Sequence, residues 1–192
     1  MIKAGKSGAS ANTPKNIMFG AGTIHKNLKY SDGTWNFEES IMGATQGGSK
    51  ISIKPEFADI EVDGALVAVK GLKVKTGETA SMEINFVEIT KEVIKTALLG
   101  SDGVSEDANF DLIESTATIN EGDYLENIAF VGETLDGRKV IVIMDNALCT
   151  SGFESEGKNK EAGLLTCTFE CHADLTSDVD VLPYHIYYPK TV

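Results

Sequence analysis

Hydrophobic and polar residues alternate along much of the region between residues 43 and 100, and a period of two predicts β-strands. Over residues 80–86 the even positions are apolar and the odd positions are polar. A strand with this pattern buries one face and exposes the other. Residues 58–62 and 67–74 are also predicted as strands, with a turn at Asp63 and Gly64 and a bulge at Gly71. Residues 43–48 are read as a glycine-rich loop before these strands.

One short helix is expected at about residues 90–99. Thr90 suits the N-cap, Ile89 and Ile94 are spaced for a hydrophobic staple, and Gly100 is placed to stop the helix. The apolar positions form one narrow stripe, which predicts a helix laid against a sheet. The stripe consists of Val93, Ile94, Ala97 and Leu98.

The remaining patterns extend the sheet on both sides of this region. Strands are expected at residues 17–25, with a break at the glycines, at 34–37 and at 110–119. Residues 124–134 and 138–144 flank the best hairpin signal in the chain, and residues 165–173 alternate with Cys167 and Cys171 inward. The fold class is therefore mainly β, an antiparallel β-sandwich or barrel with one short flanking helix.

The two ends differ in composition from the middle. Residues 1–15 are too polar and glycine-rich to join a core, so they are expected to form an N-terminal arm. Pro183 and Pro189 make residues 179–192 an edge strand or a C-terminal arm. Residues 16–178 are expected to be a single domain. The first arm and residues 40–49 are expected to be mobile in isolation and ordered only against a partner.

Charge and cysteine content narrow the functional classes. The net charge is −12, and Arg138 is the only arginine among 17 basic residues, so specific nucleic-acid recognition is not expected. The chain has three cysteines and no recognisable leader, which predicts free, buried thiols in a reducing compartment. It has no run of about 20 apolar residues, so no membrane span is expected.

No catalytic or metal-binding pattern stands out. His25, His172 and His185 are scattered, and no Gly-x-Ser-x-Gly motif occurs. Cys167 and Cys171 would lie about 13 Å apart on one strand, too far to share a zinc ion. The acidic segment at residues 105–116 lacks the glycine and the closing carboxylate of a calcium loop. Neither an enzyme nor a cofactor is expected.

A set of short motifs, taken in order, resembles a known family. The motifs are Gly20-Ala21-Gly22, the loop Gly43-Ala44-Thr45-Gln46-Gly47-Gly48, the strand end at residues 60–64, Val69-Lys70-Gly71, and Glu88-Ile89-Thr90 leading into the helix. Over residues 15–145 the chain is similar to the major tail protein, or tail tube protein, of long-tailed bacteriophages. Tubes of contractile tails and of secretion systems are close variants of this family.

The resemblance implies a structural protein of the virion tail, made in the host cytoplasm. Its subunits would form hexameric rings stacked into a tube whose lumen conducts DNA as non-specific cargo. The implied partners are other copies of this chain, a tape measure protein in the lumen, and tail-tip or terminator proteins at the ends. The alternative is a monomeric β-sandwich module that binds a carbohydrate or a cell-surface ligand, with Trp35 and the tail tyrosines as its aromatic platform.

Candidate residues for the lumen come from strands with one entirely polar face, and candidate residues for contacts come from the loops and arms. The residues expected to face the lumen are Ser81, Glu83, Asn85, Asn127, Thr166, Thr168 and Glu170. The residues expected at contacts between subunits or rings are Lys3, Lys6, Thr45, Gln46, Gly47, Gly48, Tyr184, Tyr187 and Tyr188.

Overall fold

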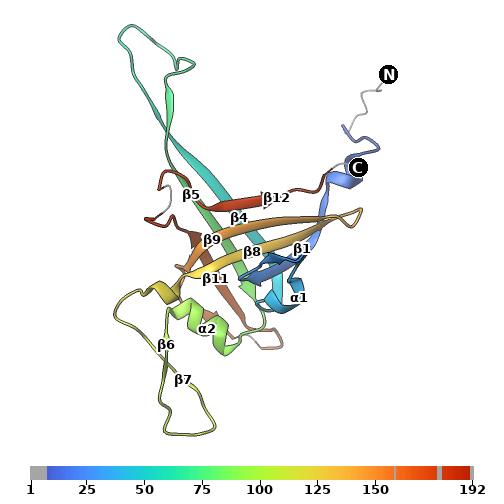
Figure 1. The fold of residues 1–192 in the computed structure, drawn as a ribbon, viewed down its shortest axis with the longest axis vertical. Coiled ribbons are helices and arrows are strands. Elements are labelled where there is room, and N and C mark those ends of the chain that lie inside the picture. The colour runs from blue at the N-terminus through green and yellow to red at the C-terminus, as the bar shows by residue number, and fades with distance from the viewer. Residues whose placement is uncertain (1–7, 158, 177–178, 191–192) are drawn as a thin grey trace.

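The computed structural model describes residues 8–157, 159–176 and 179–190, so Lys3 and Lys6 lie outside the described residues. The described chain is mainly antiparallel β (Figure 1). The helical elements are η1 (Thr13–Asn16), α1 (Phe37–Ser40), α2 (Lys91–Leu98) and η2 (Glu121–Asp123). The strands are β1 (Met18–Lys26), β2 (Tyr30–Ser31), β3 (Thr34–Trp35), β4 (Thr45–Asp59), β5 (Lys73–Phe86), β6 (Ser101–Gly103), β7 (Leu112–Glu114), β8 (Leu125–Thr134), β9 (Lys139–Cys149), β10 (Ser155–Glu156), β11 (Leu164–Cys171) and β12 (Tyr184–Tyr187).

Eight of these strands form one sheet with the order β1-β8-β9-β11-β5-β4, to which β10 adds on β11 and β12 on β9. One edge of β9 pairs with β8, whereas the other edge pairs first with β12 and then with β11. The sheet folds over at this point into two layers, β1-β8-β9-β12 and β11-β5-β4. The mainly β, antiparallel fold predicted from the sequence is confirmed.

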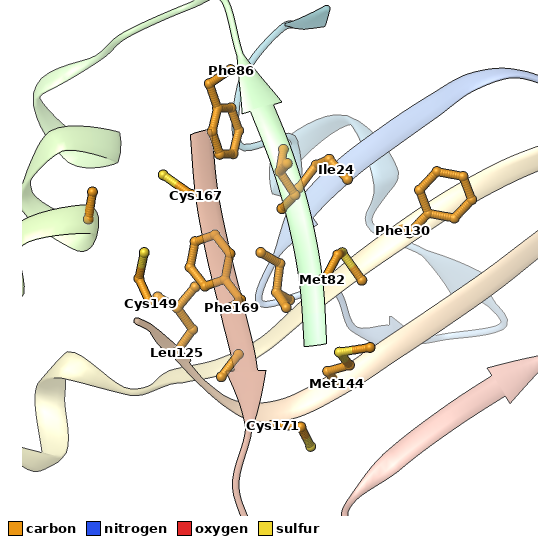
Figure 2. Close-up of a cluster of buried hydrophobic side chains, with 14 of the residues drawn as sticks. Ile24, Met82, Phe86, Leu125, Phe130, Met144, Cys149, Cys167, Phe169 and Cys171 are labelled. Atoms are coloured by element: carbon orange, nitrogen blue, oxygen red, sulfur yellow. The ribbon is translucent and has the colours of Figure 1, made fainter. Parts of the chain in front are cut away.

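The main core lies between these layers. Figure 2 shows Met82 and Phe169, from β5 and β11, close to side chains from β1, β8 and β9. The alternation predicted for β5 and β11 is confirmed, because Ala80, Met82, Ile84, Phe86, Leu165, Cys167, Phe169 and Cys171 are all buried.

A smaller core lies on the outer side of the β8-β9 layer. Ile141 and Ile143 pack there with Leu28, under the rings of Trp35 and Phe37. Residues 34–37 were expected to form a strand, but only Thr34–Trp35 does so, and Phe37 begins the short helix α1. The segment turns back because Asp32 and Gly33 have positive φ and close a tight hairpin.

Helix α2 agrees with the sequence at its start and differs at its end. The Thr90 side chain accepts a hydrogen bond from Val93 N at 3.2 Å, which confirms the N-cap. Val93 and Ala97 are buried, but Leu98 is 43% exposed, so the buried stripe is narrower than predicted. The residue in the left-handed conformation that ends the helix is Leu99, at φ 51°, and not Gly100. A glycine is required at position 100 for another reason, because a Cβ there would lie 2.9 Å from Ile113 Cγ2.

The hairpin of β4 and β5 corrects the prediction for residues 43–74. The glycine-rich segment is the start of β4 and not a loop, while residues 60–72 form a loop and not two strands. The register of the two strands shifts between Thr45 and Ser49 and again between Glu56 and Phe57, whereas Gly71, where a bulge was expected, lies in the loop at φ 93°. Because the hairpin projects beyond the sandwich (Figure 1), the alternating residues of this loop have no layer to pack against. Residues 110–119 likewise contribute only the three residues of β7.

Candidate assembly surfaces

Six of the residues predicted to face a lumen come together on one face of the β11-β5 layer. The strand register places Thr166 opposite Asn85, and Thr166 Oγ1 donates a hydrogen bond to Asn85 Oδ1 at 2.7 Å. Residues directly opposite each other in an antiparallel pair share a face. The other opposed pairs are Thr168 with Glu83 and Glu170 with Ser81.

Strand β4 extends this face with residues that the sequence analysis did not single out. Lys50 lies opposite Glu83, and Lys54 lies opposite Thr79. The alternating pattern of residues 50–54 could have predicted that these lysines face outward. Lys50, Ser52 and Lys54 alternate with Ile51 and Ile53, which are half-buried against the main core. The polar face, defined here as the outward residues of β4, β5 and β11, therefore carries both signs of charge.

Asn127 does not belong to the polar face, contrary to the prediction. It lies in β8 and is only 8% exposed. Its Oδ1 accepts a hydrogen bond from Leu28 N at 2.9 Å, and its Nδ2 donates to Leu28 O at 3.2 Å. Asn127 thus anchors the segment that covers the smaller core, and both polar atoms of its side chain form hydrogen bonds within the protein.

The predicted contact segment at residues 45–48 forms the start of an open sheet edge. Thr45 pairs with Phe86 and Ser49 with Ile84, so the pairing skips Gln46, Gly47 and Gly48 and the strand bulges there. Gly47 and Gly48 have φ values of 82° and 84°, which favour glycine. Among the described strands β4 is hydrogen-bonded only to β5, although β1 packs close to part of β4. Unpaired edges of this length readily accept another strand.

The projecting loop of residues 60–72, called the hairpin tip below, exposes a concentration of apolar side chains. Leu66 is 98% exposed and Val67 is 78% exposed. Ile60, Val62 and Val69 are exposed as well. Below the tip, the Lys73 ammonium pairs with Asp59 at 2.9 Å. Contiguous exposed apolar surface of this kind marks a contact site for another molecule.

The three tail tyrosines go to different places. Tyr184 is half-buried, and its hydroxyl donates to Glu78 Oε1 at 3.3 Å. Tyr188 is exposed and donates to Asn16 Oδ1 at 3.0 Å. Tyr187 reaches the outer face of the β8-β9 layer, where its ring centroid lies 5.1 Å from that of Trp35. Within residues 179–192, for which an edge strand or an arm was expected, Tyr184–Tyr187 forms a strand that pairs with β9.

Arg138 sits at the turn of the β8-β9 hairpin and contacts both end segments. Its guanidinium donates to the backbone carbonyls of Lys15 and Lys190 and pairs with Asp136. The described parts of the two arms therefore have contacts within their own chain.

His25 is a buried polar group that the sequence did not distinguish. It is 2% exposed, and its ring nitrogens lie 2.7 Å from Thr23 Oγ1 and 2.9 Å from Ser40 Oγ. Burial, together with the nearby charge of Lys139, lowers the pKa of His25 below its usual value. The neutral ring joins β1 to the end of α1 and so helps to hold the cover of the smaller core.

Other chemistry in the described residues is sparse. Cys149, Cys167 and Cys171 are free and buried, and burial raises the pKa of Cys171 to about 12, so this thiol is neutral. No group of three or more histidine, cysteine or acidic residues is placed to hold a metal ion in the described part of the chain. None of the described helices has the length and apolar character needed to cross a membrane.

No protein-family model matches the chain, and no curated protein matches it in sequence. Among solved structures, the chain is similar to one in the "Virion of native gene transfer agent (GTA) particle". That similarity has a TM-score of 0.45 at 12% sequence identity and covers 80% of this chain and 92% of that one.

Proposed function

We propose that the protein is the structural subunit of a phage tail tube, which forms hexameric rings that stack around a DNA-conducting lumen. The observation that carries this proposal is the polar face of β4, β5 and β11, which lies beside the open edge of β4. A layer that is apolar inward and polar outward, with a free edge, suits a wall built from repeated copies.

The open edge of β4 supplies the contact within a ring. A long edge strand with no strand hydrogen-bonded to its outer side is an aggregation hazard in a monomer. When each subunit offers its edge to the next in a head-to-tail manner, a closed ring uses every such edge. The polar faces of the subunits then lie next to one another around the lumen.

The hairpin tip supplies the contact between rings. Leu66 and Val67 are almost fully exposed at the end of a hairpin that projects from the sandwich (Figure 1). Burial of apolar surface stabilises association by roughly 25 cal/mol per Å² before the costs of ordering are subtracted. A neighbouring ring of the same protein gives these side chains an apolar environment.

The chemistry of the polar face suits a lining along which DNA slides. Glu83 and Glu170 are offset by Lys50 and Lys54, and the face carries no arginine among its described residues. Phosphate groups therefore meet a mixed surface with few strong donors, and contacts with lysine weaken as salt increases. In this role the chain is not an enzyme and needs no cofactor. Its partners are further copies of itself, a tape measure protein and the proteins that end the tail.

Electron microscopy of the purified protein in negative stain tests the proposal. The wild type is expected to form rings and tubes as its concentration increases. The double variant Leu66→Asp/Val67→Asp is expected to fold normally, because both side chains are exposed, and to form no tubes. Leu175→Asp is a matched control, since Leu175 is 92% exposed but lies far along the chain from the hairpin tip.

Two results would count against the tube. One is a wild-type protein that stays monomeric at every concentration and in every salt condition tested. The other is a double variant that forms tubes as readily as the wild type, which would remove the hairpin tip from the stacking contact.

A further inference from the structure

We propose that Tyr30, Trp35 and Tyr187 form a binding site for a neutral saccharide on the outer face of the β8-β9 layer. Two segments about 150 residues apart in sequence meet there. The site lies on the opposite side of the sandwich from the polar face and does not depend on assembly into a tube. It is called the aromatic site below.

The three rings form a stepped surface around Trp35. The centroids of Tyr30 and Trp35 lie 5.1 Å apart with their planes tilted by 56°, and those of Trp35 and Tyr187 lie 5.1 Å apart at 74°. Trp35 is half-buried and rests on Phe37, with ring centroids 6.3 Å apart. The central ring is thus fixed from below, while Tyr30 is 60% exposed and Tyr187 is 48% exposed.

Hydrogen-bonding groups lie beside the rings. His185 precedes Tyr187 by two residues in β12, so both side chains project from the same side of the strand. His185 is exposed, and its Nε2 lies 3.1 Å from Asp145 Oδ2. Ser31 and Asp32 are exposed in the turn between Tyr30 and Trp35.

This combination matches the chemistry of a pyranose ring. Such a ring presents an apolar C–H face that stacks on an aromatic side chain, and a rim of hydroxyl groups that needs hydrogen-bond partners. Tyrosine and tryptophan offer large, rigid contact areas at a low cost in conformational entropy. A neutral ligand is favoured because Asp32 and Asp145 and a net charge of −12 repel acidic glycans.

Trp35 is the only tryptophan, so its fluorescence reports directly on the aromatic site. The purified full-length protein is titrated with soluble hexasaccharides of glucose and of N-acetylglucosamine. At least one of them is expected to shift the Trp35 emission in a saturable way, with a Kd of about 1 mM or tighter, as suits an open surface.

Tyr187→Ala is expected to weaken this binding about tenfold, and Tyr187→Phe is expected to retain it because the ring surface remains. Tyr188→Ala is the matched control: Tyr188 is the next residue and is 57% exposed, but its hydroxyl contacts Asn16 and not the cluster. It is expected to bind within about twofold of the wild type. Thermal unfolding of each variant identifies any loss caused by misfolding.

The inference is overturned if neither hexasaccharide gives a saturable change up to about 10 mM, or if Tyr188→Ala weakens binding as much as Tyr187→Ala does. It is also overturned if the Trp35 emission shifts with protein concentration alone and this shift is lost in Tyr187→Ala. That result would assign the aromatic site to contact with a second copy of the chain. Each of these outcomes is independent of whether tubes form.

Discussion

The two outer faces of the sandwich differ in polarity: one is polar and exposed to solvent, and the other is apolar and covered by another segment of the chain. The polar face of β4, β5 and β11 carries serine, threonine, glutamate and lysine side chains and has no covering element among the described residues. The outer face of β8 and β9 carries Ala129, Val131, Ile141 and Ile143, and residues 27–40 fold across it. One face needs no cover because its side chains are solvated, whereas the other depends on a cover for its stability.

The contrast also separates stability from function. Side chains on a solvated face contribute little to the free energy of unfolding and are free to be selected for contacts with cargo or neighbours. Side chains under a cover are constrained by packing, and a substitution there alters the fold before it alters any contact. Paired substitutions on the two faces therefore test the distinction directly.

The largest effect is expected from Ile143→Ala, because Ile143 is 5% exposed under the cover. Removing its buried atoms should lower the free energy of unfolding by about 2–5 kcal/mol. Glu83→Ala on the polar face is the matched control and should change it by less than about 0.5 kcal/mol. Urea denaturation followed by Trp35 fluorescence measures both. Similar losses in the two variants would show that the polar face is also covered.

A smaller effect is expected from Asn127→Ala. The change removes both hydrogen bonds to Leu28 and leaves a buried N–H and a buried carbonyl without partners. A loss of about 1–3 kcal/mol is expected. Asn85→Ala, on the polar face, should cost less, because water can reach and replace the amide that bonds Thr166 at this half-exposed position. If Asn127→Ala were neutral, the amide could not be the anchor of the cover.

The smallest effect concerns His25 and depends on pH. Its pKa is lowered in the folded protein by burial and then by Lys139, so the unfolded chain binds the proton more readily. His25 therefore contributes no pH dependence well above pH 6.5, and stability falls as the pH decreases from about 6.5, by at most about 1.4 kcal/mol per pH unit. Denaturation midpoints between pH 5 and 8 measure this decline. His25→Gln should remove that part of it, whereas His185→Gln, at an exposed site, should retain it.

The sequence predicted strands and their outward residues correctly where one face of a strand is buried and the other is exposed to solvent. Alternation identified β5 and β11 and six residues of the polar face, and the turn at residues 135–137 identified the β8-β9 hairpin. These signals are local and depend only on the strand period. The Thr90 cap is local in the same way.

Sequence reasoning failed where the outcome depended on distant segments. Strand β8 is buried on both faces, so its pattern could not say that Asn127 points under a cover made by residues 27–40. Residues 58–62 alternate as a strand does, but β4 ends at Asp59, and no described strand pairs with the residues beyond it. Leu98 continues the apolar stripe of α2 and is exposed because the helix packs through Val93 and Ala97. The meeting of Trp35 and Tyr187 had no local signal.

Strand β9 belongs to both layers of the sandwich, and this has a consequence for how the molecule comes apart. Residues 141–144 pair with β12 and residues 147–149 with β11, while the opposite edge pairs with β8 along its length. Neither layer can detach without breaking the ladder of the same strand. The backbone amides of β9 should therefore exchange with deuterium only through global unfolding, and both layers should melt in one cooperative transition.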